Sequence, residues 1–94
     1  MIQEAIEKKY TSMTEAVKLF GKPSHTIRNY SKRLEPFKEY GNIHRGRFRG
    51  EGAEYLYTKT QLAWLQQMIA LLNTNYYTMH GAVHFTYEYM TLNK

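Results

Sequence analysis

Polar side chains between residues 24 and 32 have the types that read nucleic-acid bases and hold phosphate. Arginine can donate two parallel hydrogen bonds to guanine and asparagine can pair with adenine, so Arg28 and Asn29 are candidates for base contacts. Thr26 and Lys32 are better suited to phosphate oxygens. A solvated helix face carries the same residue types, and this alternative stays open here. The candidate set is Ser24, His25, Thr26, Arg28, Asn29 and Lys32.

Three alternating arginines form a second cluster of cations. In an extended strand, Arg45, Arg47 and Arg49 would point to one side, where they could contact phosphates or a narrow groove of DNA. Charged residues also protect the edge of a sheet from pairing with other chains. The stretch Arg45–Gly50 interleaves arginine with glycine and Phe48, a pattern that resembles RNA-binding segments. DNA contact, edge protection and RNA contact are therefore all open for this cluster.

The residue pairs that could support catalysis or bind a metal are incomplete. Ser24 and His25 are neighbours, so on a helix their side chains point apart, and no third carboxylate that could orient them is evident. His80 and His84 are spaced to share a helix face, but the chain has no Cys and no Asp. It also has no glycine motif that cradles nucleotide phosphates. We predict no enzyme activity, no catalytic residue, no bound metal and no cofactor.

The composition favours a single basic domain with a polyanionic partner. The chain has 94 residues, of which 43% are hydrophobic and 22% charged, as in one folded domain. Its 13 Lys and Arg exceed its 8 acidic residues, which gives a net charge of +5. Residues 1–34 carry seven basic and three acidic residues, whereas residues 61–94 carry one of each. We therefore expect polyanion contacts from the first 60 residues.

The sequence shows no signal for a membrane or for secretion. No apolar run approaches the about 20 residues that span a bilayer. Met1–Tyr10 carries four charges and lacks the apolar segment of a secretory signal. We expect a cytoplasmic protein without membrane contact.

Capping residues and apolar spacing predict how the first candidate set is positioned. Ser12 and Glu15 have the spacing of a capping box, and Gly21 suits the end of the helix that begins there. Ser24 is placed to cap a second helix, which closes before Pro36. Two short helices joined by a turn with glycine form the helix-turn-helix pattern. The predicted buried face of the second helix is Ile27, Tyr30 or Ser31, and Leu34.

The rest of the chain predicts a glycine-rich hairpin and two further helices. We place the hairpin tip at Gly50–Gly52, because glycine adopts the positive φ of tight turns. Thr58 and Gln61 form a second capping box at the start of a core helix. The predicted fold is mainly α with a small β-hairpin wing, a winged helix-turn-helix. Its units are a tail or short helix (1–11) and one domain (12–94) with a helix-turn-helix (12–35), a wing (37–57), a core helix (59–73) and a C-terminal helix (78–90).

The tyrosine-rich end of the chain supports two interpretations. Its aromatic residues could cover the core as part of the last helix. Where they are exposed, they would instead form a surface for a protein partner or a second copy. The candidates for self-association are Tyr76, Tyr77, Tyr87 and Tyr89.

One resemblance to a known family lies in Thr26-Ile27-Arg28-Asn29-Tyr30 with the preceding apolar helix and Gly21. Together these residues resemble the start of MerR-type DNA-binding domains. Leu56-Tyr57-Thr58 is similar to the strand end of that family, and Tyr77-Thr78-Met79 to the start of its fourth helix. The resemblance covers about residues 12–85. It implies that the second helix enters the major groove and that the wing lies on the neighbouring backbone or minor groove.

The chain departs from that family at several points. Family members commonly carry Arg where this chain has Tyr55, and the segment between Leu34 and Tyr55 is longer and richer in Arg. Full regulators continue into a long dimerisation helix and an effector pocket, for which residues 1–94 show no counterpart. The chain therefore resembles the DNA-binding half alone, as excisionase-like and other small mobile-element proteins do.

Together these observations predict a small regulatory or architectural factor that binds double-stranded DNA site-specifically. It could control transcription or assist recombination, conjugation or plasmid partition, because all four use the same binding chemistry. A single module buries little surface on DNA, so a homo-oligomer on DNA or a protein partner is expected. The alternatives are a protein interaction module that uses the aromatic C-terminal segment and an RNA-binding protein.

Overall fold

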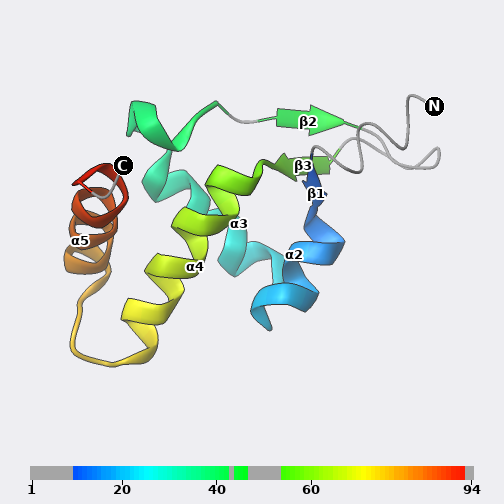
Figure 1. The fold of residues 1–94 in the computed structure, drawn as a ribbon. Coiled ribbons are helices and arrows are strands. Elements are labelled where there is room, and N and C mark those ends of the chain that lie inside the picture. Colours follow the sequence, from blue (N-terminus) through cyan, green and yellow to red (C-terminus); the bar gives the residue numbers. More distant parts are fainter. Residues whose placement is uncertain (1–9, 43, 47–53, 93–94) are drawn as a thin grey trace.

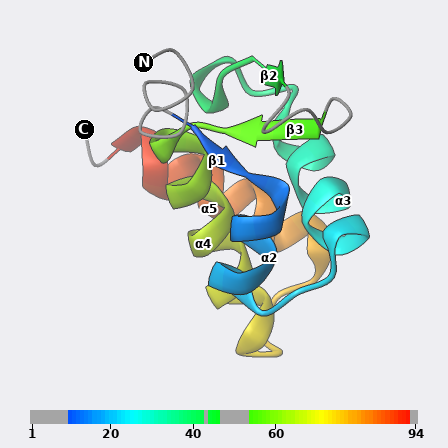
Figure 2. The same ribbon diagram turned by 90° about the vertical axis from the view of Figure 1, so that its right-hand side faces the viewer.

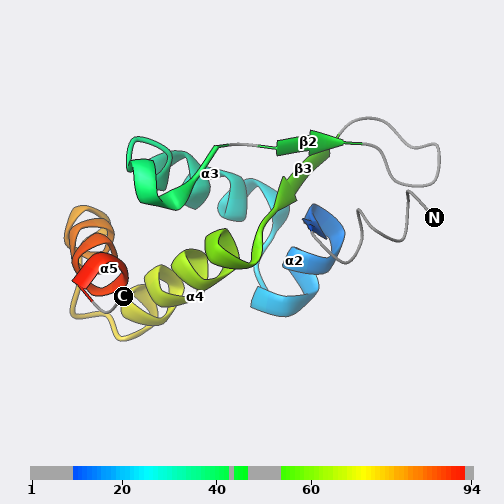
Figure 3. The ribbon, with the colours of Figure 1, turned by 45° about the horizontal axis from the view of Figure 1, so that its top comes forward.

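The computed structural model describes residues 10–42, 44–46 and 54–92, which form four α-helices, a short 3-10 helix and a small antiparallel sheet (Figure 1). This is the mainly helical, winged helix-turn-helix architecture that the sequence predicts. The sheet and the last helix lie on different sides of the central helix (Figures 1 and 3). In chain order the elements are β1 (Thr11–Ser12), α2 (Met13–Phe20), α3 (Ser24–Leu34), the 3-10 helix η1 (Lys38–Tyr40), β2 (His44–Gly46), β3 (Glu54–Tyr57), α4 (Lys59–Asn73) and α5 (Met79–Leu92).

The bounds of α2 are set by local signals at both ends. Ser12 Oγ accepts a hydrogen bond from the Glu15 amide at 3.3 Å, so Ser12 caps the helix as predicted. This is one half of the predicted capping box, since the Glu15 side chain does not return a hydrogen bond to the Ser12 amide. Gly21 has a φ of +65°, a left-handed conformation that glycine adopts without strain, and its amide donates to the Val17 carbonyl at 2.9 Å. The turn to α3 follows directly.

The predicted cap of α3 is wrong by one residue. Pro23 is the N-cap, with φ −61° and ψ 155°, and its carbonyl accepts from the amides of Thr26 and Ile27 at 3.1 and 3.2 Å. Ser24 is the first helical residue, and no side chain caps this helix. Proline fixes the extended cap geometry one position early, which draws Ser24 into the first turn.

The wing differs from the predicted hairpin at its start and in its partners. Lys38–Tyr40 forms the 3-10 helix η1, so the extended segment begins only at His44. The sheet has the order β1-β3-β2, in which β3 pairs with both neighbours in antiparallel fashion. β1 was not predicted, because its two residues pair with Leu56 and Tyr57, far along the chain. The predicted tip, Gly50–Gly52, lies outside the described residues.

The central helix α4 contacts α2, α3, α5, η1 and β3. Its predicted capping box is present: the Gln61 amide donates to Thr58 Oγ1, and the Thr58 amide donates to Gln61 Oε1, both at 3.1 Å. Gln61 is also buried and donates through Nε2 to the Asn42 carbonyl at 2.8 Å. One side chain therefore joins the start of α4 to the turn before β2.

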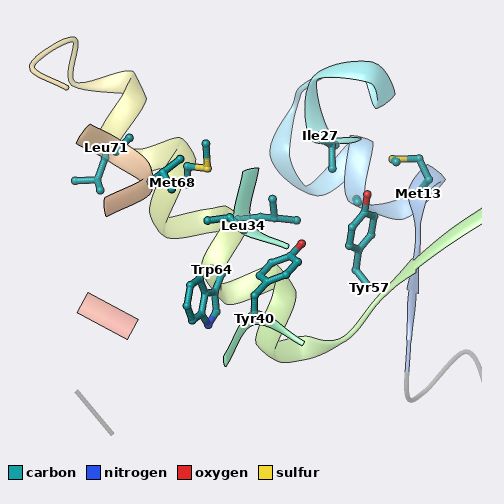
Figure 4. Close-up of a cluster of buried hydrophobic side chains, with 12 residues drawn as sticks. Met13, Ile27, Leu34, Tyr40, Tyr57, Trp64, Met68 and Leu71 are labelled. Atoms are coloured by element: carbon teal, nitrogen blue, oxygen red, sulfur yellow. The ribbon is translucent and has the colours of Figure 1, made fainter. Parts of the chain in front are cut away.

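Aromatic rings occupy the centre of the core. Trp64 lies edge-on to Tyr40, with 5.8 Å between the ring centroids, and both pack near Leu34 (Figure 4). Phe37 stacks on Tyr87 at 4.6 Å, and both rings also approach Trp64. The tyrosine-rich end therefore contributes Tyr87 to the interior of the fold.

The buried face of α3 contains one polar residue. Ile27 and Leu34 are fully buried, and Ser31 lies between them. Ser31 Oγ and Tyr40 Oη are 2.6 Å apart, a buried hydrogen bond that joins α3 to η1. The Tyr57 hydroxyl is buried nearby but has no hydrogen-bond partner among the described residues.

Burial also changes the acidity of the two phenols under α3. It raises the pKa of Tyr57 from 10.0 to about 12, and it raises the pKa of Tyr40 further above its usual value. The nearby Ser31 hydroxyl opposes the rise in both tyrosines, although only Tyr40 lies within hydrogen-bond distance of it. Both phenols are therefore held in the neutral form.

We expect Ser31→Ala to destabilise the fold by about 1–3 kcal/mol, because the Tyr40 hydroxyl would stay buried without its partner. The double variant with Tyr40→Phe should lose less than the two single variants together, since no polar atom is then stranded. Urea unfolding of the four proteins measures this coupling. Tyr57→Phe is the control: it removes a hydroxyl that makes no hydrogen bond, so stability should stay equal or rise. Additive losses would show that the two hydroxyls are not coupled.

Stability should fall in alkaline solution. The unfolded chain releases the proton of Tyr57 near pH 10, while the folded chain retains it to about 12, so rising pH favours unfolding across that window and leaves stability unaffected below it. Tyr57→Phe and Tyr40→Phe should each flatten the decline. The free energy of unfolding, measured in urea from about pH 8 to about pH 11.5, tests this linkage. An equal decline in the wild type and the double Phe variant would contradict it.

Candidate nucleic-acid interface

The outward face of α3 gathers most of the predicted DNA-contacting residues. His25, Arg28, Asn29 and Lys32 are all exposed. Their spacing of i, i+3, i+4 and i+7 places them on one face of the helix, away from its buried side. α3 itself forms an outer side of the molecule (Figure 2). The structure therefore presents these four side chains together to solvent.

The other two members of the predicted set are less accessible. Ser24 and Thr26 are half-buried in the first turn of α3. Thr26 lines an open groove between α3 and the start of α5. A phosphate group of DNA could enter this groove and contact Thr26. The groove is lined by Thr26, Asn29, Tyr30, Lys32, Arg33 and Met79.

Arg33 is a candidate that sequence analysis missed. It is exposed in the last turn of α3 and lines the groove beside Lys32. Its basic type was the only signal in the sequence. Met79 lies beside the end of α3 and forms part of the groove. It is more than forty positions from Arg33 in the sequence, so no local sequence pattern predicts the groove.

The charge on α3 has one sign. The helix contains no acidic residue between Ser24 and Leu34, and Lys32 and Arg33 lie in its last turn. Cations at this position are favoured by the partial negative charge of a helix C-terminus. A face with several cations and no carboxylate of its own attracts phosphate and repels other cations.

The exposed side chain of Arg28 also contacts the sheet. Its guanidinium carbon lies over the ring of Tyr55, 5.7 Å from the ring centroid, which is a cation–π distance. Tyr55 belongs to β3, so the outward face of α3 is in contact with the sheet.

The structure describes only part of the predicted set of wing arginines. Arg45 lies in β2, where its backbone pairs with Tyr55, but its side chain is outside the described part of the structure. Arg47 and Arg49 lie outside the described residues altogether. Their role stays a prediction from the sequence.

The two histidines considered for metal binding, His80 and His84, are exposed. The rings of His80 and His84 are 4.5 Å apart on the surface of α5. Within the described residues, no group of three or more His, Cys, Asp or Glu comes close enough to hold a metal ion. Every helix in the same part of the chain is too short or too polar to cross a lipid bilayer.

The aromatic residues considered for self-association divide into two pairs. Tyr77 and Tyr87 are half-buried and pack against the core. Tyr76 is 90% exposed and Tyr89 is 47% exposed. Phe85, another aromatic residue of the tyrosine-rich end, is also exposed on α5, and so is Leu92, which was not predicted.

One of three comparisons with known proteins gave a match. The sequence model described as MerR HTH family regulatory protein matches residues 11–86, which include α2, α3, the wing and most of α5. Neither the comparison with curated proteins nor that with solved structures gave a match. The family match spans well over half of the chain and contains the whole exposed face of α3. The chain therefore belongs to the MerR helix-turn-helix family of DNA-binding regulatory proteins.

Proposed function

We propose that this protein binds a specific double-stranded DNA site and acts there as a small regulator. The observation that carries the proposal is the exposed row of His25, Arg28, Asn29 and Lys32 on α3, the second helix of a MerR-type helix-turn-helix. The major groove of B-DNA accepts one helix and displays a distinct donor and acceptor pattern for each base pair. A helix with these side chains on its outer face can read that pattern.

Different residues of α3 contact the bases and the phosphates. Arg28 donates to a guanine and Asn29 pairs with an adenine, so these two supply sequence preference. Lys32 and Arg33 hold phosphates beside the groove and fix the position of the helix. The arginines of the wing, Arg45, Arg47 and Arg49, add phosphate or minor-groove contacts, which strengthen binding to every duplex alike.

A small DNA-binding module can act in several kinds of regulation. Control of transcription is the role that the family suggests. An excisionase-like accessory role in recombination, conjugation or plasmid partition uses the same contacts, with several copies bound at repeated sites in the cytoplasm. In each case the protein works by occupying DNA, without catalysis.

A second candidate function is self-association through α5. Phe85, Tyr89 and Leu92 follow one another at i, i+4 and i+7, and Leu92 is 79% exposed. This stripe lies in the third of the chain with almost no net charge, so two copies could approach there without strong repulsion. Association of copies would increase the surface that contacts DNA.

Selection of bound duplexes from a random DNA pool tests site-specific binding. We expect a recovered motif that binds roughly a thousandfold or more tightly than scrambled duplex. The comparison is made at two salt concentrations, because phosphate contacts weaken with salt on every sequence. Tighter binding to RNA or single strands than to any duplex would favour the RNA alternative, and the absence of a motif would reject site-specific binding.

Arg28→Ala should reduce affinity for the selected duplex by about 1–3 kcal/mol and leave scrambled duplex nearly unaffected, since Arg28 reads a base. Arg28→Lys is the matched control: it keeps the charge but loses the two parallel hydrogen bonds, so sequence preference should not recover. Fluorescence anisotropy with both duplexes separates the effects. Equal weakening on both duplexes by Arg28→Ala, with full recovery in Arg28→Lys, would make Arg28 a phosphate contact instead.

Self-association predicts a concentration-dependent increase in mass in sedimentation equilibrium. Phe85→Ser with Leu92→Ser should abolish that increase, because the pair removes the apolar stripe of α5. Leu19→Ser is the control, since Leu19 is 64% exposed on α2, away from this stripe. A monomer at all concentrations, or an equal effect of Leu19→Ser, would exclude α5 as the contact between copies.

A further inference from the structure

The contact between Arg28 and Tyr55 joins the outward face of α3 to the central strand of the sheet. The guanidinium carbon is 5.7 Å from the ring centroid and lies over the ring. We propose that Tyr55 is a specificity-determining positioning residue: its ring holds the Arg28 side chain in the direction from which it reads a base. The inference rests on the proposed function, because it assigns a role to Tyr55 within the same DNA-binding site.

Tyr55 is fixed more firmly than the arginine it contacts. It lies in β3, which is paired on both sides, and its backbone stands opposite Arg45 of β2. Its ring is half-buried and packs against the hydrophobic core. A free arginine side chain samples many rotamers, whereas one laid over a fixed ring samples few. The ring therefore reduces the ordering that Arg28 must undergo when it meets DNA.

The chemistry of the contact suits a base-reading arginine. A cation–π contact uses the face of the guanidinium and leaves its N–H groups, which lie in its plane, free to donate. A carboxylate partner would occupy those same N–H groups and neutralise the charge. An aromatic ring can therefore orient Arg28 without competing with guanine for its donors.

The first test needs no DNA. In NMR spectra of the wild-type protein, we expect nuclear Overhauser effects between the Arg28 δ protons and the Tyr55 ring, together with an upfield ring-current shift of those protons. Tyr55→Leu should abolish the upfield shift, and Tyr55→Phe should preserve it. Arg28 δ protons with random-coil shifts in the wild type would overturn the inference.

The second test measures preference at the base pair that Arg28 reads. To locate that base pair, each position of the selected duplex is changed in turn. The base pair is the position at which the wild type prefers the selected base and Arg28→Ala does not. We expect Tyr55→Leu to reduce the affinity ratio between the selected duplex and one changed at that pair by roughly threefold to tenfold. Affinity for scrambled duplex should not change, Tyr55→Phe should restore the ratio, and adding Tyr55→Leu to Arg28→Ala should cause no further loss.

The outcomes separate this inference from the proposed function. If Tyr55→Leu weakens all duplexes equally, Tyr55 has a general structural role and the inference fails, while site-specific binding stands. The same holds if Tyr55→Leu leaves the ratio unchanged although Arg28→Ala lowers it. If Arg28→Ala changes preference at no base pair, both the reading role of Arg28 and its positioning by Tyr55 are overturned.

Discussion

The fold depends on how α3 is held, because this helix has few inward positions and must keep its other face open. Ile27 and Leu34 are fully buried and anchor the two ends of its inner side. Ser31 between them would be a liability in an apolar core, since a buried hydroxyl without a partner is costly. Its hydrogen bond to Tyr40 removes that cost and, together with the burial of Ile27 and Leu34, favours one rotation of α3 about its axis. That rotation decides which side chains face outward, so the buried pair underlies the geometry of the candidate interface.

Local signals in the sequence were sufficient for the elements that depend on neighbouring residues. The cap at Ser12, the left-handed Gly21 and the capping box at Thr58 and Gln61 each involve residues at most three or four positions apart. Such contacts depend on side-chain type and spacing, both of which can be read from the chain. The prediction for the start of α3 was wrong for a local reason too. Pro23 and Ser24 are both common at the start of a helix, and residue preferences alone do not show which of them is the N-cap.

Contacts between distant residues account for what the sequence did not reveal. β1 forms because Thr11 and Ser12 pair with Tyr57 and Leu56. A two-residue segment has no sequence pattern that predicts such pairing. In the candidate site the same limit applies. The outward residues of α3 were predictable from helical spacing, but the groove at Arg33 and the contact between Arg28 and Tyr55 arise from the packing of α3 against α5 and β3. Alternation of aromatic residues in β3 gave no sign that one of them faces an arginine.

Tyrosine in place of a cation at position 55 changes how binding free energy is divided. A cation there would add a phosphate contact, which strengthens binding to all sequences and weakens with salt. An aromatic ring adds no such contact, but in the proposed site it would orient Arg28, the cation that we propose reads a base. Under that proposal the exchange shifts binding free energy from general affinity to preference for a sequence. Under the proposed function, general affinity would come from other cations, and Lys32 and Arg33 are exposed in the last turn of α3, where they could contact phosphates. The cations at the end of α3 and the Tyr55 ring beside Arg28 would then have complementary roles, the cations in general affinity and the ring in preference for a sequence.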